Sequence, residues 1–79
     1  MITVRILMRG TLKKLVPGGE ATVTLPDSST CAEALAAIGI DWKDIPSFGF
    51  VSVNGMRVMI DSALRDGDLL KAFSKVSGG

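Results

Sequence analysis

The sequence contains no histidine and only one cysteine, Cys31. Without histidine, the chain cannot assemble the Ser-His or Cys-His pairs used by many enzymes with a side-chain nucleophile. One cysteine cannot form an internal disulfide, and no cysteine-histidine cluster has the spacing of a zinc site. The composition therefore argues against an ordinary active site and against a resident metal.

Strong charge and long apolar runs are also missing. The formal net charge is +1, aromatic residues make up 5% of the chain, and no basic run is present, which argues against nucleic acid as the main partner. The longest apolar run, from Ala34 to Ile40, is far below the roughly 20 residues of a membrane span. The N-terminus lacks the pattern of a secretory signal. We expect a cytoplasmic protein with no membrane partner.

What the chain does have is a high apolar content for its size. It has 79 residues, of which 47% are hydrophobic, so we expect one domain with a small core. A core of this size cannot cover every apolar side chain. We therefore expect some of them to form a surface that meets another protein.

Hydrophobic periodicity predicts two strands and then a helix in the first half. Apolar residues alternate over 2–8 and 21–25, with turn chemistry in the loop 10–19 between them. Thr30 followed by Glu33 is typical of a capping box, and Gly39 fits the position just past a helix end. The pattern predicts a helix over 31–38.

The pattern in the second half of the sequence predicts three more strands. Asp41 is a candidate cap for a short helical turn that Pro46 would end. Asn54-Gly55 is the strongest short hairpin signal, since a type I′ turn needs positive φ at both central residues. The expected elements are strands over 50–53, 57–60 and 69–73, and one helical turn over 62–64.

This order of elements predicts an α+β domain over residues 1–73. A mixed β-sheet would carry one main helix packed across one face, with the first and last strands free to pair in parallel at its centre. Residues 74–79 would form a flexible C-terminal Gly-Gly tail.

Two other features have a chemical and a structural interpretation. Asp66 and Asp68 flank Gly67 and could bind a cation, but we favour a turn in which aspartate accepts backbone hydrogen bonds. Cys31, in the first turn of the helix, could be a reactive thiol, but we favour a small buried residue.

The tail is the stronger candidate for chemistry. From Ser74 to Gly79 the chain can extend roughly 20 Å, and glycine has no Cβ to keep Gly78 and Gly79 out of a narrow channel. The functional group would be the terminal carboxylate. Joining it to AMP makes a mixed anhydride, from which a sulfur nucleophile could displace AMP and leave a thiocarboxylate. An activating partner would supply the catalytic groups that the chain lacks.

Several motifs of the C-terminal half resemble the bacterial and archaeal sulfur carriers, namely the small subunit of molybdopterin synthase and the thiamin-biosynthesis sulfur carrier. The resemblance implies a ubiquitin-like β-grasp fold and a thiocarboxylate at Gly79. It also implies an E1-like adenylating enzyme that uses ATP, a sulfur donor protein and an acceptor synthase subunit, with no cofactor bound tightly to the chain itself. The motifs that carry it are Val51-Ser52-Val53-Asn54-Gly55, Leu64-Arg65-Asp66-Gly67-Asp68, Phe73 and Val76-Ser77-Gly78-Gly79.

The resemblance also divides the last strand into two faces. Leu70 and Ala72 would face the core, while Leu69, Lys71 and Phe73 would lie on the opposite face. Core packing is the alternative role for the apolar residues among them. The expected partner-binding residues are Phe73, Leu69, Val76, Ser77, Leu7 and Met59.

The pathway and the mode of use have alternatives. The Val-Ser-Gly-Gly ending favours the molybdopterin type over the thiamin type, although Ser74 and Lys75 stand where molybdopterin-type carriers often have two prolines. On this interpretation the chain is a carrier and cosubstrate, not an enzyme. The alternatives are a ubiquitin-like modifier joined through Gly79 to lysines of other proteins, and a non-catalytic binding module with an incidental ending.

Overall fold

The computed structural model describes residues 1–75, and residues 76–79 lie outside this part of the chain. Residues 1–75 contain five strands, one α-helix and three short 3₁₀ helices. In chain order these are β1 (Ile2–Met8), η1 (Gly10–Leu15), η2 (Pro17–Gly19), β2 (Glu20–Leu25), α1 (Cys31–Ala37), η3 (Trp42–Asp44), β3 (Phe48–Val53), β4 (Met56–Val58) and β5 (Leu69–Ser74).

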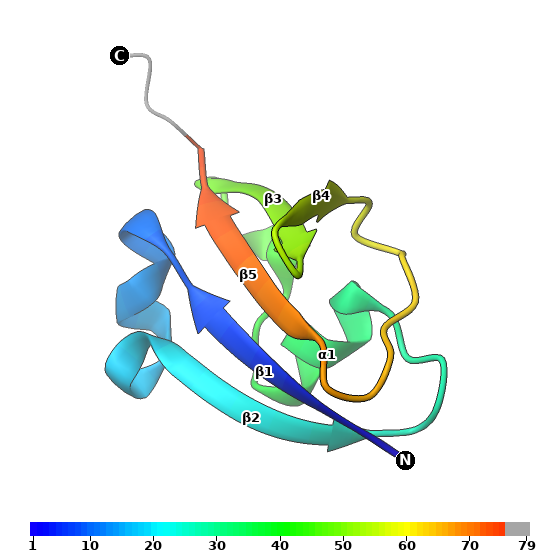
Figure 1. Cartoon of the computed structure of the whole chain (residues 1–79). Helices are drawn as coiled ribbons and strands as arrows, with labels where there is room; N and C mark the ends of the chain where they lie inside the picture. Colours follow the sequence, from blue (N-terminus) through cyan, green and yellow to red (C-terminus); the bar gives the residue numbers. More distant parts are fainter. Residues whose placement is uncertain (76–79) are drawn as a thin grey trace.

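The five strands form one mixed sheet in the order β2-β1-β5-β3-β4 (Figure 1). The central pair, β1 and β5, is parallel, in a register that places Arg5 opposite Leu69 and Met8 opposite Ala72. The other neighbouring strands are antiparallel. The predicted α+β class and the parallel pairing of the first and last strands are therefore confirmed.

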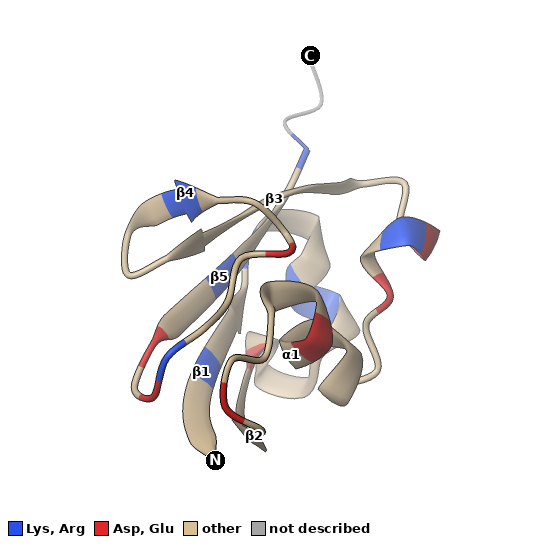
Figure 2. Ribbon diagram, turned by 90° about the vertical axis from the view of Figure 1, so that its right-hand side faces the viewer, with Lys and Arg blue, Asp and Glu red and all other residues tan. Residues whose placement is uncertain are grey.

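The core lies between the sheet and α1, which covers one face only (Figures 1 and 2). Alternate residues of β1 and β5 point into this core, as the period-two pattern predicts. Each large aliphatic side chain buried there contributes roughly 1.5–3 kcal/mol. The largest fully buried side chains are Ile6, Met8, Leu12, Leu35, Leu70, Val4, Val51 and Cys31. No helix within residues 1–75 has the length and hydrophobicity needed to cross a membrane.

The predicted capping box at the start of α1 is present. The Glu33 N–H donates to the Thr30 Oγ1 (3.2 Å), and the Thr30 N–H donates to the Glu33 carboxylate (2.9 Å). The next N–H, that of Cys31, donates to the Ser62 carbonyl at 3.0 Å. This contact explains why the predicted helical turn over 62–64 is wrong: the backbone there is extended and bonds to the segment that begins α1.

The Asn54-Gly55 turn joins β3 to β4 with φ of +53° and +86°, as a type I′ turn requires. Asn54 also ties this hairpin to the turn before β5. Its side-chain oxygen accepts from the Leu69 N–H (2.9 Å), and its amide donates to the Asp68 carboxylate (2.9 Å). Two motifs from the sequence thus form one hydrogen-bonded cluster.

Five strand ends differ from the prediction; β2 and β4 each begin one residue early, at Glu20 and Met56. β3 begins at Phe48 instead of residue 50, because an irregularity in its pairing with β5 carries the ladder past Gly49. β4 ends at Val58, two residues early. β5 includes Ser74, which the sequence placed in the free tail.

Candidate partner surface and tail root

The face of the sheet opposite α1 carries three of the six residues expected to bind a partner, namely Leu7, Leu69 and Phe73. Leu69, Lys71 and Phe73 alternate with the buried Leu70 and Ala72 along β5 and are half-buried. This confirms the predicted division of the strand. Leu7 lies on the same face of β1, opposite Lys71 in the parallel register, so two adjacent strands bring together Leu7, Leu69 and Phe73.

Phe50 of β3 extends this apolar surface. Its ring stacks on that of Phe73, with centroids 4.7 Å apart and an interplanar angle of 14°. The Arg57 guanidinium lies over the Phe50 ring, with its Cζ 4.6 Å from the ring centroid. We call the set Leu7, Phe50, Leu69 and Phe73 the outer patch. Phe50 and Arg57 were not among the residues predicted for this surface, although strand alternation places Phe50 on the face opposite Val51.

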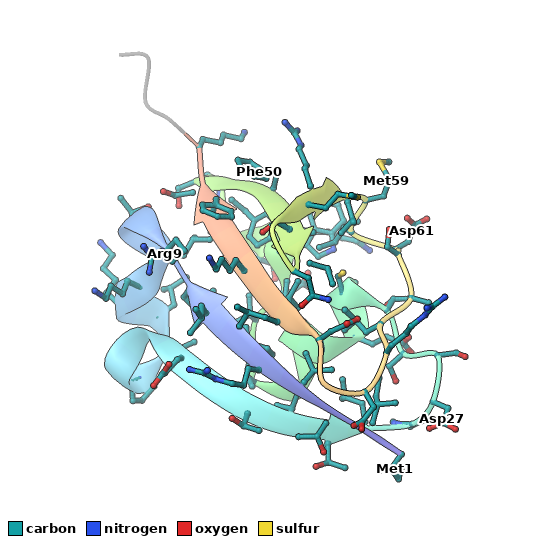
Figure 3. All side chains as sticks on the ribbon, in the orientation of Figure 1. Met1, Arg9, Asp27, Phe50, Met59 and Asp61 are labelled. Carbon is teal, nitrogen blue, oxygen red and sulfur yellow. The ribbon has the colours of Figure 1, made fainter. Side chains whose placement is uncertain are left out.

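Met59 lies just past β4 and is 72% exposed. It lines a hollow of about 220 Å³ at the β4 edge, which extends from Phe50 and Arg57 of the outer face to Trp42 and Phe48 of the core side (Figure 3). The other predicted site residues, Val76, Ser77, Gly78 and Gly79, lie outside the described residues.

Basic groups surround the outer patch. Lys or Arg residues appear on β1, β5 and β4 (Figure 2). Arg5 of β1 pairs with Glu20 of β2 at 3.1 Å. Within residues 1–75 the remaining ion pair joins the N-terminus to Asp27, which leaves Arg57 and Lys71 available to acidic groups of a partner.

Asp66 and Asp68 serve the turn before β5. Asp66 accepts a hydrogen bond from the Thr3 N–H (2.7 Å), and Asp68 accepts one from the Arg65 N–H (2.8 Å). Asp66 thereby holds the turn against the start of β1, and Asp68 closes the turn itself, which supports the turn interpretation.

Cys31 is fully buried at the start of α1. Burial raises the pKa of its thiol; a backbone hydrogen bond works in the opposite direction, and the charges of Asp68 and Asp61 add to the increase. A higher pKa means less thiolate at a given pH, and the thiolate is the reactive form. The structure therefore supports the packing role over the reactive one.

We accordingly expect Cys31 in the folded protein to react with iodoacetamide at least about tenfold more slowly than free cysteine at a pH of about 8, near the ordinary thiol pKa. Mass spectrometry of the time course measures the rate. Unfolding in guanidinium should restore the rate of a free thiol. Equally fast alkylation in the folded state would contradict the burial.

The mixed sheet, the single covering helix and the strand order define the ubiquitin-like β-grasp fold. Solved structures with a similar fold include the following three. One is provisionally described as molybdopterin converting factor subunit 1 from Pyrococcus furiosus (TM-score 0.76, 22% identity, 96% of this chain and 100% of that chain). Another is small archaeal modifier protein 1 from Haloferax volcanii (TM-score 0.79, 19% identity, 96% and 100%). The third is a complex of subunits 1 and 2 of the molybdopterin-converting factor from Helicobacter pylori (TM-score 0.66, 16% identity, 99% and 100%).

At these identities, the likeness establishes the fold. No protein-family model matches the sequence, and no curated protein matches it either.

Proposed function

We propose that the protein is a sulfur carrier whose Gly79 carboxylate is adenylated by an E1-like enzyme and converted to a thiocarboxylate. One observation carries the proposal: β5 contributes Leu69 and Phe73 to the outer patch and leads directly into the root of the tail, Ser74 and Lys75. Phe73 lies on the outer face of β5, and Ser74 and Lys75 follow it directly. A partner that docks on the outer patch therefore also receives the end of the chain.

The chemistry needs no catalytic group from this chain. A carboxylate oxygen of Gly79 attacks the α-phosphorus of ATP, and pyrophosphate leaves. Hydrosulfide delivered by a sulfur donor protein then attacks the acyl carbon and forms the new C–S bond. The bond from this carbon to the bridging oxygen breaks, and AMP leaves with that oxygen. The adenylating enzyme supplies the charge stabilisation for both steps. The chain is thus a cosubstrate whose own task is to dock and to present its end.

The sulfur acceptor that we propose is a synthase subunit of the molybdopterin type. The ending Val76-Ser77-Gly78-Gly79 favours this over the thiamin type. Support also comes from the Helicobacter pylori neighbour, which is a complex of subunits 1 and 2 of the molybdopterin-converting factor.

Exchange of labelled pyrophosphate into ATP tests the adenylation step. The reaction contains the chain, the adenylating enzyme of its source, ATP and labelled pyrophosphate. We expect exchange that depends on the chain and saturates with its concentration. Absence of exchange, with an enzyme shown to be active on another carrier, would count against the proposal.

The basic groups around the outer patch favour a partner with an acidic rim. Lys71→Glu should weaken binding to the adenylating enzyme about threefold to tenfold, and added salt should weaken wild-type binding, because rim charges act through screened attraction. Lys43→Glu on η3, outside the outer patch, is the matched control and should leave Kd within twofold. Isothermal titration calorimetry measures Kd for both variants and for the wild type at each salt concentration. Equal effects of the two variants would refute the role of the patch.

A second candidate is a protein modifier joined through Gly79 to lysines. The Haloferax volcanii neighbour, named as a modifier protein, favours it. The same adenylated carboxylate serves both functions, so they diverge only after activation. A ladder of heavier, Gly79-dependent conjugates in cells would support the modifier function.

A further inference from the structure

The end of β5 is held by two other parts of the chain. The Thr11 N–H, in η1, donates to the Ser74 Oγ at 3.2 Å. On the other side, the Lys75 N–H donates to the Ser47 carbonyl at 2.6 Å. Ser74 also pairs with Phe48 at the beginning of β3. The direction of the chain at Lys75 is therefore set by contacts from both sides.

Gly49 is required by the closeness of β3 to the end of β5. A Cβ at this position would lie 2.9 Å from the Phe73 carbonyl oxygen and 2.9 Å from the Ser74 carbonyl carbon. Real Cβ contacts are almost never this short, and both neighbours are backbone atoms, so β5 itself would have to move. Gly49 also lies where the β3–β5 register shifts between Phe48 and Phe50. The register shift thus brings the Gly49 backbone, which has no side chain, against the backbone of Ser74 and Lys75.

Gly10 makes the matching approach from the other side. A Cβ there would clash with the Ser74 Oγ, the atom that accepts the Thr11 hydrogen bond. Its φ is +63°, a conformation that favours glycine. Gly10 and Gly49 are both exposed, so neither position presents a side chain that would keep a partner away from Lys75.

We propose that Gly10, Gly49 and Ser74 are positioning residues for activation, which aim the tail by fixing the chain direction at Lys75. This inference rests on the proposed function. Docking on the outer patch places the domain, but reaction requires the carboxylate within about 3–3.5 Å of its target, and a misplacement of about 1 Å can cost about 100-fold in rate. A tail root that swings freely would reach that geometry less often.

We call the contacts of Gly10, Thr11, Ser47 and Gly49 with Ser74 and Lys75 the clamp. The variants G10A and G49A test the clamp, with G18A as the control. Gly18 has a φ of +70°, close to that of Gly10, but a Cβ there would meet no atom within 4 Å. G18A thus reproduces the backbone strain of G10A without touching Ser74. Two quantities are measured for each folded variant: hydrogen exchange of the Lys75 amide, and kcat and KM for pyrophosphate exchange with the adenylating enzyme.

We expect G10A and G49A to speed Lys75 exchange and to lower kcat about tenfold, with KM for the chain within twofold, while G18A matches the wild type. An unchanged kcat, or a rise in KM alone, would overturn the positioning role. Unchanged Lys75 exchange in both variants would overturn the clamp itself. An inactive wild type would instead overturn the proposed function, and with it the role in activation, whatever the amide exchange shows.

Discussion

Removal of Gly78 and Gly79 is expected to abolish activation and to leave folding intact. The truncated chain would end in the carboxylate of Ser77, drawn back by about 7 Å at roughly 3.3 Å per extended residue. Because reacting groups must approach to about 3–3.5 Å, we expect pyrophosphate exchange to fall by at least about 1000-fold. The sheet ends at Ser74, so the thermal unfolding midpoint should not change.

An Ala-Ala ending in place of Gly78-Gly79 is the matched control. It restores the reach of the carboxylate and adds only two Cβ atoms, so the loss relative to wild type measures how narrow the receiving channel is. Binding of the truncated chain to the enzyme should persist through the outer patch. Activation of the truncated chain at the wild-type rate would show that Gly79 does not carry the reacting group.

Phe73→Ala should weaken binding to the adenylating enzyme by about tenfold to 100-fold. Aromatic anchors at the centre of an interface commonly contribute about 1–3 kcal/mol, and each 1.4 kcal/mol is about a tenfold change in Kd. The folding loss should be smaller. Losing the stacked pair with Phe50 costs about 0.5–1.5 kcal/mol beyond the buried area, which lowers the unfolding midpoint by several degrees.

Phe48→Leu is the control on the other face. Phe48 is 8% exposed and belongs to the core, so this variant should lower the unfolding midpoint while the folded protein keeps its Kd within about twofold. If Phe73→Ala instead lowers stability and leaves Kd unchanged, Phe73 serves only to pack against Phe50.

The features that the sequence predicted correctly depend on neighbours along the chain. Alternation in β5 separates Leu70 from Leu69 because successive side chains of a strand point to opposite faces. The capping box joins Thr30 to Glu33, and the Asn54-Gly55 turn needs positive φ at two adjacent residues. Each signal lies within a few residues.

The features that were missed depend on register between distant segments. Phe50 stacks on Phe73 only because β3 and β5 pair with one particular offset, and no local pattern fixes that offset. Ser74 belongs to the sheet because η1 and β3 reach it from both sides. The predicted helical turn over 62–64 was wrong because its backbone bonds to the beginning of α1. Tertiary contacts outweighed local propensity there.

The most direct test of the sulfur-carrier function is the intact mass of the chain after incubation with its adenylating enzyme, ATP and the sulfur donor. The mass of the untreated protein first confirms the free carboxylate at Gly79. We predict a gain equal to the exchange of one oxygen for sulfur, localised to Gly79 by fragmentation and absent without ATP. An unchanged mass, with an enzyme and a donor that convert another carrier in the same experiment, would contradict the sulfur-carrier function.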